Sequence, residues 1–380
     1  WPMGHPGIYL FRHADVMQWL RDGRMLRTPN SLPEVQAMRE QEQWEPPVRD
    51  SFAFISNRFM LFLDPPNHTR LRGLANRAFT PRVVADRRAE IEAIAGDLLR
   101  AFREEQGGEG DLIRALAYPL PVLVIARVLG IPSEDMHRLR EWAAVLGAAI
   151  DVPMEALADF QARADDSTRE MCEYLRSIVM KRRDDPRDDL ISRLIAARDD
   201  EGRLTEDELI ATCVLLMIAG HETTVNLIAN GTLALMRHRD QWDRLVADPG
   251  LAGNATEELL RYDSPVQFTG RTAGEDIEIG GVKVPRGTWV SMMLGSANRD
   301  EAVWDEPDAL RIDRQVGRHM SFGMGIHFCL GAPLARLEGE IAFATLAREA
   351  PELTLTDPNP RWRPGAVLHG LERLDVRLGA

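Results

Sequence analysis

The apolar positions of this 380-residue chain recur mostly with a helical period. Apolar residues three and four positions apart line one face of a helix, as they do within 91–102 and 334–341. Strand patterns are fewer and come late. Alternating apolar residues on both sides of Gly280-Gly281 predict a hairpin, and 289–294 and 371–378 predict two further extended segments. The pattern predicts a mainly α protein with small β-sheets.

One apolar segment, from Ile210 to Met236, is long enough to cross a membrane and carries only two ionisable residues, His221 and Glu222. A lipid-facing helix would not readily hold these two groups at mid-depth. Thr205, followed three residues later by Glu208, forms a capping-box pattern that marks a helix start. We therefore predict a long helix through the protein core and no membrane span.

The organisation of the chain favours a single domain over residues 1–380. No Ser/Gly linker, internal repeat or low-complexity tract divides it, and the charged run from Lys181 to Asp189 is interpreted as a solvated loop. The chain begins at Trp1, without a charged-then-apolar leader, and we expect a trimmed N-terminus.

The charge balance bears on possible partners. Lys and Arg number 46 against 59 Asp and Glu, a formal net charge of −13, which has the wrong sign for a nucleic-acid partner. Three cysteines, Cys172, Cys213 and Cys329, lie far apart and predict neither a zinc ribbon nor a disulfide framework. A reducing compartment, the cytoplasm, is expected.

The most informative segment surrounds Cys329. Gly323 and Gly325 allow a tight turn that can approach a flat ligand closely. Cys329 comes just before a helix with an early proline, so its sulfur is expected to face backbone N–H groups, a setting that favours thiolate. A thiolate in a glycine-lined loop suits the axial position of a haem iron. The alternative is a buried cysteine beside a glycine turn.

The sequence from Phe322 to Gly331, FGMGIHFCLG, resembles the haem-binding loop of the cytochrome P-450 superfamily and matches every fixed position of that pattern. The resemblance implies one haem b per chain, with Cys329 as the metal ligand. It also implies a soluble bacterial-type member in which the haem lies between the long helix and the helix after Cys329. The implied cofactor contacts within this loop are Phe322, Gly323, His327, Cys329 and Gly331.

A second pattern, Ala219-Gly220-His221-Glu222-Thr223, lies in the middle of the predicted core helix. Glycine weakens a helix and threonine can bond back to a carbonyl, so a kink with a satisfied polar pair is one interpretation. The pattern is also similar to the oxygen groove of the same family. That resemblance implies that Ala219 and Gly220 contact the cofactor, and that Thr223 and Glu222 form a catalytic pair delivering protons to oxygen.

Glu258 and Arg261 are three residues apart and share one helix face. By resemblance they belong to a buried network completed by an arginine from the 307–314 segment, and we assign that place to Arg314. Leu310 stands where phenylalanine is common, which leaves the alignment of this segment open.

The two propionates of a haem need matched cations when they are buried. By resemblance, His68 and Arg72 in one helix, Arg271 at the start of the strand region, and His327 in the cysteine loop supply them. His68 and Arg72 are four residues apart and are expected to face the same way.

The expected function is that of a haem-thiolate monooxygenase. By resemblance it uses O₂ and two electrons to hydroxylate or epoxidise a hydrophobic small molecule. No flavin-domain length or dinucleotide fingerprint follows the haem part, so a ferredoxin-type donor with its reductase is expected to supply the electrons to what is predicted to be a monomer. Candidates for a basic docking face are Arg70, Arg72, Arg77 and Arg82.

Two alternatives remain open at this point. The protein can be a peroxygenase driven by H₂O₂, or a non-catalytic haem-binding sensor or carrier. The Glu222-Thr223 pair argues against both, because neither needs a proton relay to build an oxidant from O₂.

Overall fold

The computed structural model describes residues 7–41, 47–147, 157–197 and 202–379. Helices dominate, and the prediction of a mainly α protein with small sheets is confirmed. The α-helices are α1 (His13–Arg21), α2 (Pro33–Gln41), α3 (Phe52–Ser56), α4 (Asn67–Ala78), α5 (Pro81–Ala85), α6 (Arg88–Gln106), α7 (Pro119–Leu129), α8 (Met136–Gly147), α9 (Leu157–Asp184), α10 (Leu190–Ala196), α11 (Glu206–Arg237), α12 (Arg239–Ala247), α13 (Ala252–Tyr262), α14 (Leu294–Ala297) and α15 (Ala332–Glu349). The strands are β1 (Ile8–Leu10), β2 (Met25–Leu26), β3 (Glu109–Asp111), β4 (Phe268–Ala273), β5 (Ile277–Ile279), β6 (Val282–Val284), β7 (Trp289–Met293), β8 (Thr354–Leu355) and β9 (Asp375–Arg377).

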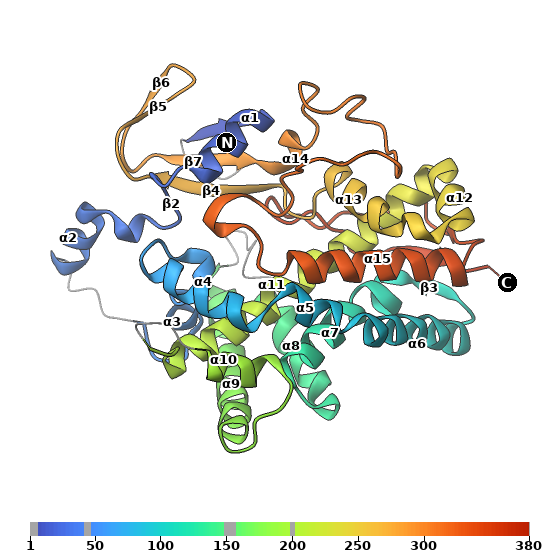
Figure 1. The fold of residues 1–380 in the computed structure, drawn as a ribbon, viewed down its shortest axis with the longest axis horizontal. Coiled ribbons are helices and arrows are strands. Elements are labelled where there is room, and N and C mark those ends of the chain that lie inside the picture. Colours follow the sequence, from blue (N-terminus) through green and yellow to red (C-terminus); the bar gives the residue numbers. More distant parts are fainter. Residues whose placement is uncertain (1–6, 42–46, 148–156, 198–201, 380) are drawn as a thin grey trace.

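Within the described ranges, the strands form three small sheets. A four-stranded sheet has the order β1-β7-β4-β2, a three-stranded sheet the order β3-β9-β8, and β5 and β6 form the predicted hairpin. The hairpin turn needs its two glycines, because Gly280 and Gly281 have φ values of 56° and 82°. The four-stranded sheet lies at one end of the molecule, at the upper left of Figure 1, and helices fill the rest.

The C-terminal extended segment is shorter than the pattern predicts. Of residues 371–378, only Asp375–Arg377 form a strand. Leu371 instead makes an isolated bridge with Trp362, and Leu371 and Leu374 are buried in the helical core. The alternating apolar residues of this segment are therefore buried by side-chain packing, although the segment does not form a continuous hydrogen-bonded strand.

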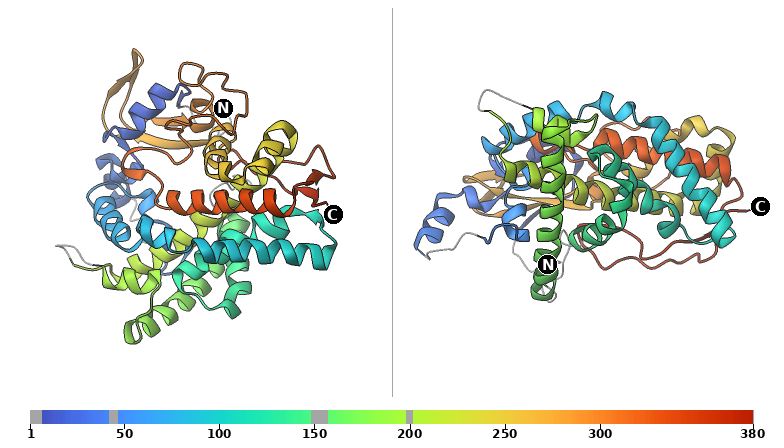
Figure 2. Two further views of the ribbon diagram at one scale, coloured as in Figure 1. Left: turned by 45° about the vertical axis from the view of Figure 1, so that its right-hand side comes forward. Right: turned by 90° about the horizontal axis from the view of Figure 1, so that it is seen from below.

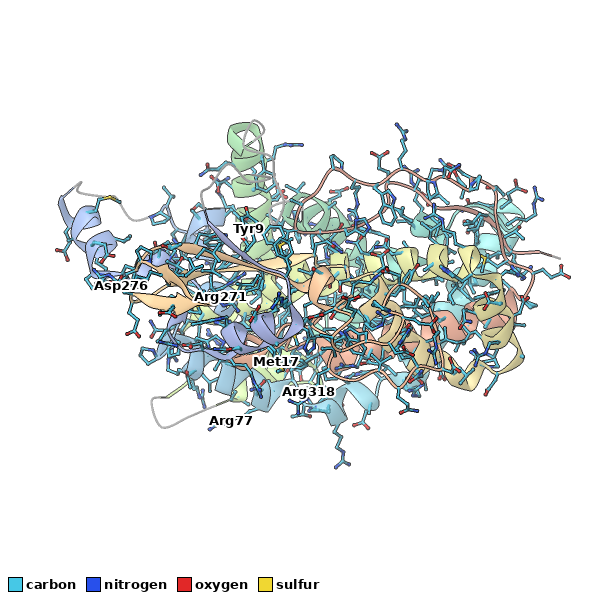
Figure 3. All side chains as sticks on the ribbon, turned by 90° about the horizontal axis from the view of Figure 1, so that it is seen from above. Tyr9, Met17, Arg77, Arg271, Asp276 and Arg318 are labelled. Atoms are coloured by element: carbon cyan, nitrogen blue, oxygen red, sulfur yellow. The ribbon has the colours of Figure 1, made fainter. Side chains whose placement is uncertain are left out.

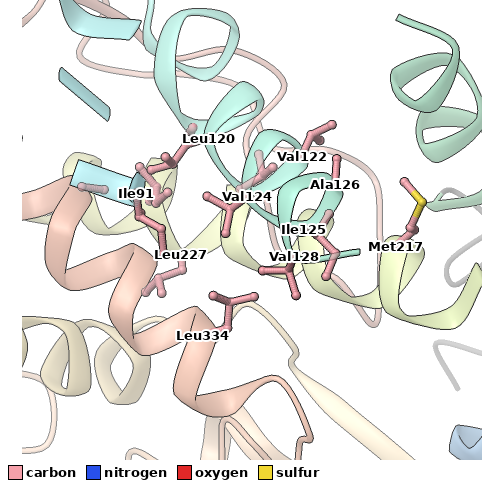
Figure 4. Packing of buried hydrophobic residues seen from close by; sticks show 14 of the residues in the cluster. Ile91, Leu120, Val122, Val124, Ile125, Ala126, Val128, Met217, Leu227 and Leu334 are labelled. Carbon is pink, nitrogen blue, oxygen red and sulfur yellow. The ribbon is translucent and has the colours of Figure 1, made fainter. Parts of the chain in front are cut away.

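The long helix α11 passes through the core. Its start is the predicted capping box: the Thr205 N–H donates to Glu208 Oε2 at 2.8 Å, and the Glu208 N–H donates to Thr205 Oγ1 at 3.3 Å. Within the described residues it alone is long and apolar enough to be tested as a membrane span, and 67% of its most apolar window is buried inside the protein. It is the core helix that the pattern predicts. Figure 4 shows Leu227 of α11 among apolar residues of α6, α7 and α15.

Helix α15 follows the cysteine loop and crosses the middle of the molecule against α11 (Figures 1 and 2). Their separation is small because Gly231 faces the ring of Phe343, and a Cβ at Gly231 would lie 2.5 Å from the Cζ atom of that ring. The two helices that flank the predicted site are thus held at close range by a residue without a side chain.

The interpretation of Lys181 to Asp189 as a solvated loop is wrong for part of this run. Helix α9 continues to Asp184, and Arg182 is buried in an ion pair with Asp189. Asp189 also caps α10, accepting the Ser192 N–H at 2.8 Å. Two charges of this run therefore lie inside because they pair with each other, while the other residues from 181 to 188 are exposed.

The apolar side chains form two clusters. The larger one holds the helices, and the smaller one lies between α1 and the four-stranded sheet. A single domain over residues 1–380 stays a prediction.

Candidate functional site

The cysteine loop turns tightly at its two glycines. Gly323 and Gly325 have φ values of 67° and 71°, the left-handed region that favours glycine. A Cβ at Gly325 would lie 2.6 Å from the carbonyl oxygen of Leu20, so the loop also packs too closely against α1 for any other residue. The Cys329 N–H donates to the Phe322 carbonyl at 2.9 Å and closes the loop.

Cys329 lies just before α15, as predicted, but its surroundings do not favour thiolate. Burial raises the pKa of the thiol, while the backbone N–H groups of Gly331 and Ala332 and the guanidinium of Arg72 lower it. The predicted backbone effect is thus present and is outweighed by desolvation of the charged form. A bound metal cation reverses this balance, because it deprotonates a coordinating thiol.

The other donors around Cys329 decide what kind of metal it can hold. Among the described residues, no group of three or more His, Cys, Asp or Glu side chains is placed to hold a metal ion. An ion bound to Cys329 must therefore bring its other ligands with it, as the iron of a haem does. The residues present fit a haem better than a bare ion.

Two histidines come together beside this loop. His68 of α4 and His327 have ring centroids 4.2 Å apart, and both ring nitrogens of His68 are buried without a hydrogen-bond partner among the described residues. Burial and nearby positive charges, with Arg271 foremost among them, lower the pKa of His327 to about 2. Buried polar atoms without partners are rare in proteins, so these rings indicate a place for a ligand.

Arg271 of β4 is the predicted third cation, and its side chain is 4% exposed. Figure 3 shows its position on the sheet. Burial and the charge of Arg27 lower the pKa of Arg271 to about 9, with Asp64 acting in the opposite direction. The side chain is held from one side only, by bonds from Nη1 to Thr269 Oγ1 at 3.1 Å and to the Gly270 carbonyl at 2.8 Å.

Sequence reasoning missed Arg27, which follows β2. Its Nη1 donates to the same two acceptors as Arg271, Thr269 Oγ1 at 2.8 Å and the Gly270 carbonyl at 3.0 Å. Burial lowers its pKa to about 10, and the carboxylate of Asp64 opposes this change. No local signal marks this arginine, because only the pairing of β2 with β4 brings it beside Arg271.

The charges around the loop are unbalanced. Asp64 accepts the backbone N–H groups of Arg27 at 2.7 Å and Thr28 at 3.2 Å, and it is the carboxylate that influences Arg27, His68 and Arg271. Buried cations without matching anions are costly. A group that carries two carboxylates, as haem does, matches this excess.

Arg72, the fourth predicted cation, is half-buried and already bonded within the loop. Its Nη2 donates to the Phe328 carbonyl at 2.7 Å, and its Nε donates to Asn76 at 3.3 Å. It lies close enough to Cys329 for the two groups to affect each other's pKa.

The predicted oxygen groove is a continuous part of α11. Thr223 Oγ1 donates to the Ala219 carbonyl and Thr224 Oγ1 to the Gly220 carbonyl, each at 3.1 Å. The two hydroxyls therefore bond back one turn, as expected, but the helix is not broken. Thr223 and Gly220 are half-buried.

Glu222 is not hydrogen-bonded to Thr223 in the described residues. Its Oε1 forms an ion pair with Arg363, from the segment before β9, and its Oε2 lies 3.6 Å from His221 Nε2. The predicted acid, Glu222, and the predicted alcohol, Thr223, are therefore adjacent in sequence but bind different partners. The sequence did not indicate that Arg363 contacts Glu222, because the two residues are 141 positions apart.

A second carboxyl lies behind the groove. Glu338 of α15 is buried against α11, and burial raises its pKa to about 8, opposed by a hydrogen bond with Thr224. It is mainly neutral at pH 7 and places little charge near Thr223.

The predicted network is assembled. Glu258 and Arg261 form a doubly bonded pair at 2.7 and 2.9 Å, and Arg314 Nε donates to Glu258 Oε1 at 3.1 Å. Glu258 and Arg261 are 0% exposed and Arg314 is 7% exposed. The remaining donors of the two arginines bond to backbone carbonyls of Asn298, Asp305, Glu306, Pro307 and Ala309.

Known proteins resemble this chain in sequence over most of its length. A family model described as Cytochrome P450 matches residues 35–248 and 251–349. The polyketide biosynthesis cytochrome P450 PksS of Bacillus subtilis is 40% identical over 98% of this chain and 89% of its own length. The vitamin D(3) 25-hydroxylase of Pseudonocardia autotrophica is 40% identical over 98% of this chain and 88% of its own.

Solved structures agree in fold. The structure of P450BioI in complex with an acyl carrier protein carrying hexadec-9Z-enoic acid matches with a TM-score of 0.87 at 38% identity, covering 99% of this chain and 93% of that one. The Bacillus subtilis PksS structure also gives a TM-score of 0.87 at 38% identity, over 98% and 90% of the two chains. With the cysteine loop, the core helix and the family model in agreement over most of its length, the chain belongs to the cytochrome P450 family.

Proposed function

We propose that Cys329 is the axial ligand through which this haem monooxygenase holds its haem b. The observation that carries this proposal is the lone sulfur at the end of a glycine loop, with no metal-ligating cluster in the described residues and with the guanidinium groups of Arg27 and Arg271 nearby. Arg27, His68, Arg72, Arg271 and His327 bind the haem carboxylates. Phe322, Gly323, Gly331, Ala219 and Gly220 line the two faces of the cofactor.

When bound, the haem supplies the redox chemistry that inserts one atom of O₂ into a substrate C–H bond or double bond while the other atom leaves as water. The chain supplies binding, orientation and protons. Its half-buried groove on α11 limits access of water. Thr223 Oγ1 donates its hydroxyl proton to the Ala219 carbonyl, a bond that must break before the proton is released into the groove, and Glu222 is the carboxylate that replenishes it.

The electron donor is a separate ferredoxin with its reductase, as the family's use of redox partners supports. Arg70 and Arg72 are not available for docking, because Arg70 pairs with Glu208 and Arg72 bonds inside the cysteine loop. Arg77 and Arg82 are exposed, and beside the loop Ile326 and Phe328 are 52% and 37% exposed. A mixed basic and apolar face of this kind fits an acidic partner. Figure 3 shows Arg77 and Arg318 at the same edge of the molecule.

The substrate is a hydrophobic small molecule that is hydroxylated or epoxidised. Named relatives support this class, since one is a vitamin D(3) 25-hydroxylase and one solved structure carries a fatty acyl chain. The cytoplasmic location and the monomeric state stay predictions.

The first prediction concerns the metal ligand. Reduced protein exposed to carbon monoxide will show the strongly red-shifted Soret band of thiolate-ligated haem, and C329S will lose it, because a serine oxygen is not a thiolate donor. The measurement is the difference between the absorption spectra of the reduced protein with and without carbon monoxide, and the haem content of both proteins is measured alongside. A red-shifted band that survives in C329S would overturn the proposal.

The second prediction concerns Arg27. R27Q will bind haem b about tenfold more weakly, because a hydrogen bond to a charged group contributes about 1.5–3 kcal/mol and tenfold corresponds to 1.4 kcal/mol. Binding is measured by titrating the apoprotein with haem b and with its dimethyl ester, which lacks both carboxylates. The ester should bind R27Q and the unchanged protein alike.

R24Q is the matched control for R27Q, because Arg24 lies in the same segment but is exposed and pairs with Asp22 at 2.6 Å. It should bind haem b normally. Equal losses for haem b and its ester in R27Q would instead assign Arg27 a purely structural role.

The third prediction concerns Thr223. T223A will bind haem normally but divert most NAD(P)H-derived electrons to hydrogen peroxide, because the groove loses its hydroxyl. The measurement is the ratio of product and peroxide to NAD(P)H consumed. Fully coupled turnover would remove Thr223 from proton delivery, and product formation from added peroxide alone at an undiminished rate would favour the peroxygenase alternative.

The fourth prediction concerns docking. R77E will raise the KM for reduced ferredoxin and leave the saturated rate nearly unchanged, because a charge at the rim of an interface acts mainly on association. The effect will shrink as salt is added. R169E, at an exposed arginine of α9, is the control and should change neither value. An unchanged KM in R77E would exclude this face.

A further inference from the structure

The segment 361–371 lies against α11 beside the oxygen groove. Asn230 of α11 donates its Nδ2 hydrogen to the His369 carbonyl at 2.9 Å. The segment folds back on itself, since the Arg363 N–H donates to the Gly370 carbonyl at 2.9 Å and the rings of Trp362 and His369 stack at 3.9 Å. The segment is therefore fixed by hydrogen bonds and ring stacking.

Arg363 joins this segment to two positions one turn apart on α11. Its Nη1 pairs with Glu222 Oε1, and its Nη2 donates to Asn226 Oδ1 at 2.5 Å. The approach requires glycine at 370, because a Cβ there would overlap Asn226 Oδ1 and lie 2.6 Å from Arg363 Nη2. The geometry thus depends on two segments far apart in the sequence, one with Glu222 and Asn226 and the other with Arg363 and Gly370.

The polar atoms around this contact are incompletely bonded. Within the part of the chain that the structure describes, His221 Nε2, Asn226 Nδ2 and Asn230 Oδ1 are buried and have no hydrogen-bond partner. His221 donates or accepts only through Nδ1, which lies 2.9 Å from the Met217 carbonyl. Groups of buried, unpaired polar atoms are the usual places for bound water in proteins.

The exposure of the contact changes along its length. The Arg363 side chain is 39% exposed, the Glu222 side chain 12%, and the His221 side chain 0%. Polar groups therefore run from solvent at Arg363, through Glu222, to the buried ring of His221.

We propose that Arg363 is a positioning residue that holds the Glu222 carboxylate at the inner end of a water-filled proton path between α11 and segment 361–371. The proposal rests on the proposed function of Glu222 and Thr223. A proton from solvent moves along waters at the unpaired atoms to a Glu222 oxygen. Glu222 passes it on to the Thr223 hydroxyl, which releases its own proton into the groove, so each passage carries one proton and leaves both side chains as they began.

The path requires Glu222 to leave one of its partners. Oε1 is held by Arg363, whereas Oε2 lies 3.6 Å from His221 Nε2 and has no hydrogen bond among the described residues. In this proposal, rotation about the Arg363 contact brings Oε2 toward Thr223 while the ion pair persists. Arg363 then acts as a pivot and not as a competitor for the carboxylate.

The test compares R363M, R363K and the control R361M in the haem-loaded protein. Arg361 is on the same segment, is 87% exposed and pairs with Glu372 at 3.4 Å, so R361M removes a cation without touching α11. R363M should lower product per NAD(P)H several-fold, raise peroxide release, and increase the solvent deuterium isotope effect on product formation. R363K should recover most of the loss, and R361M should resemble the unchanged protein.

A double-mutant cycle separates positioning from general support. E222Q and R363M combined should uncouple turnover no further than the worse single variant, because both act on one carboxylate. The cycle is repeated on the thermal unfolding midpoint of the haem-loaded protein, where the two changes should also be non-additive. Additive effects in both measurements, or unchanged coupling and isotope effect in R363M, would overturn the proposal.

The outcomes also separate this proposal from the proposed function. If the red-shifted CO band is absent from the unchanged protein, the proposed function fails. If the band is present, T223A uncouples turnover and R363M does not, then only the role of Arg363 fails. If R363M does not retain haem, R363Q, which keeps a hydrogen-bond donor without the charge, is judged by the same criteria.

Discussion

Unbalanced positive charge is the constraint on which the arrangement of the site depends. The guanidinium groups of Arg27 and Arg271 come from separate segments and meet beside two histidine rings, His68 and His327, whose pKa values are lowered. Asp64 is the carboxylate that acts on Arg27, Arg271 and His68. Protein interiors do not hold such clusters without anions nearby. The sheet, α4 and the cysteine loop are therefore arranged around a dianionic ligand that the chain alone cannot replace.

Much of the fold and part of the site could be predicted from short-range sequence patterns. The capping box at Thr205 and the turn at Gly280-Gly281 are short-range patterns with one structural solution, and both could be predicted. The cysteine loop is also local, because its two left-handed glycines and the following helix lie within a few residues of Cys329. Patterns of this kind need no knowledge of distant segments.

The residues that could not be predicted are placed by contacts between segments that are far apart in the sequence. Arg27 is placed by the register of two strands more than 240 positions apart, and Arg363 by a segment folding back onto α11. The burial of Arg182 likewise follows from its pairing with Asp189 and with the Gly130 carbonyl. The raised pKa of the Cys329 thiol was also missed, because desolvation depends on the packed interior and cannot be inferred from the neighbouring residues in the sequence.

The way Arg261 and Arg314 bond to the 298–309 region affects which substitutions that region can accept. Both arginines bind its backbone carbonyls, and no side chain of Asp305, Glu306 or Ala309 takes part in these bonds. The irregular segment is therefore recognised through its main chain. The exposed side chains of Asp305 and Glu306 can therefore be replaced without loss of these bonds, whereas the two guanidinium groups cannot. Asn298 and Trp304 of the same region are 0% and 5% exposed, so packing restricts what can replace them.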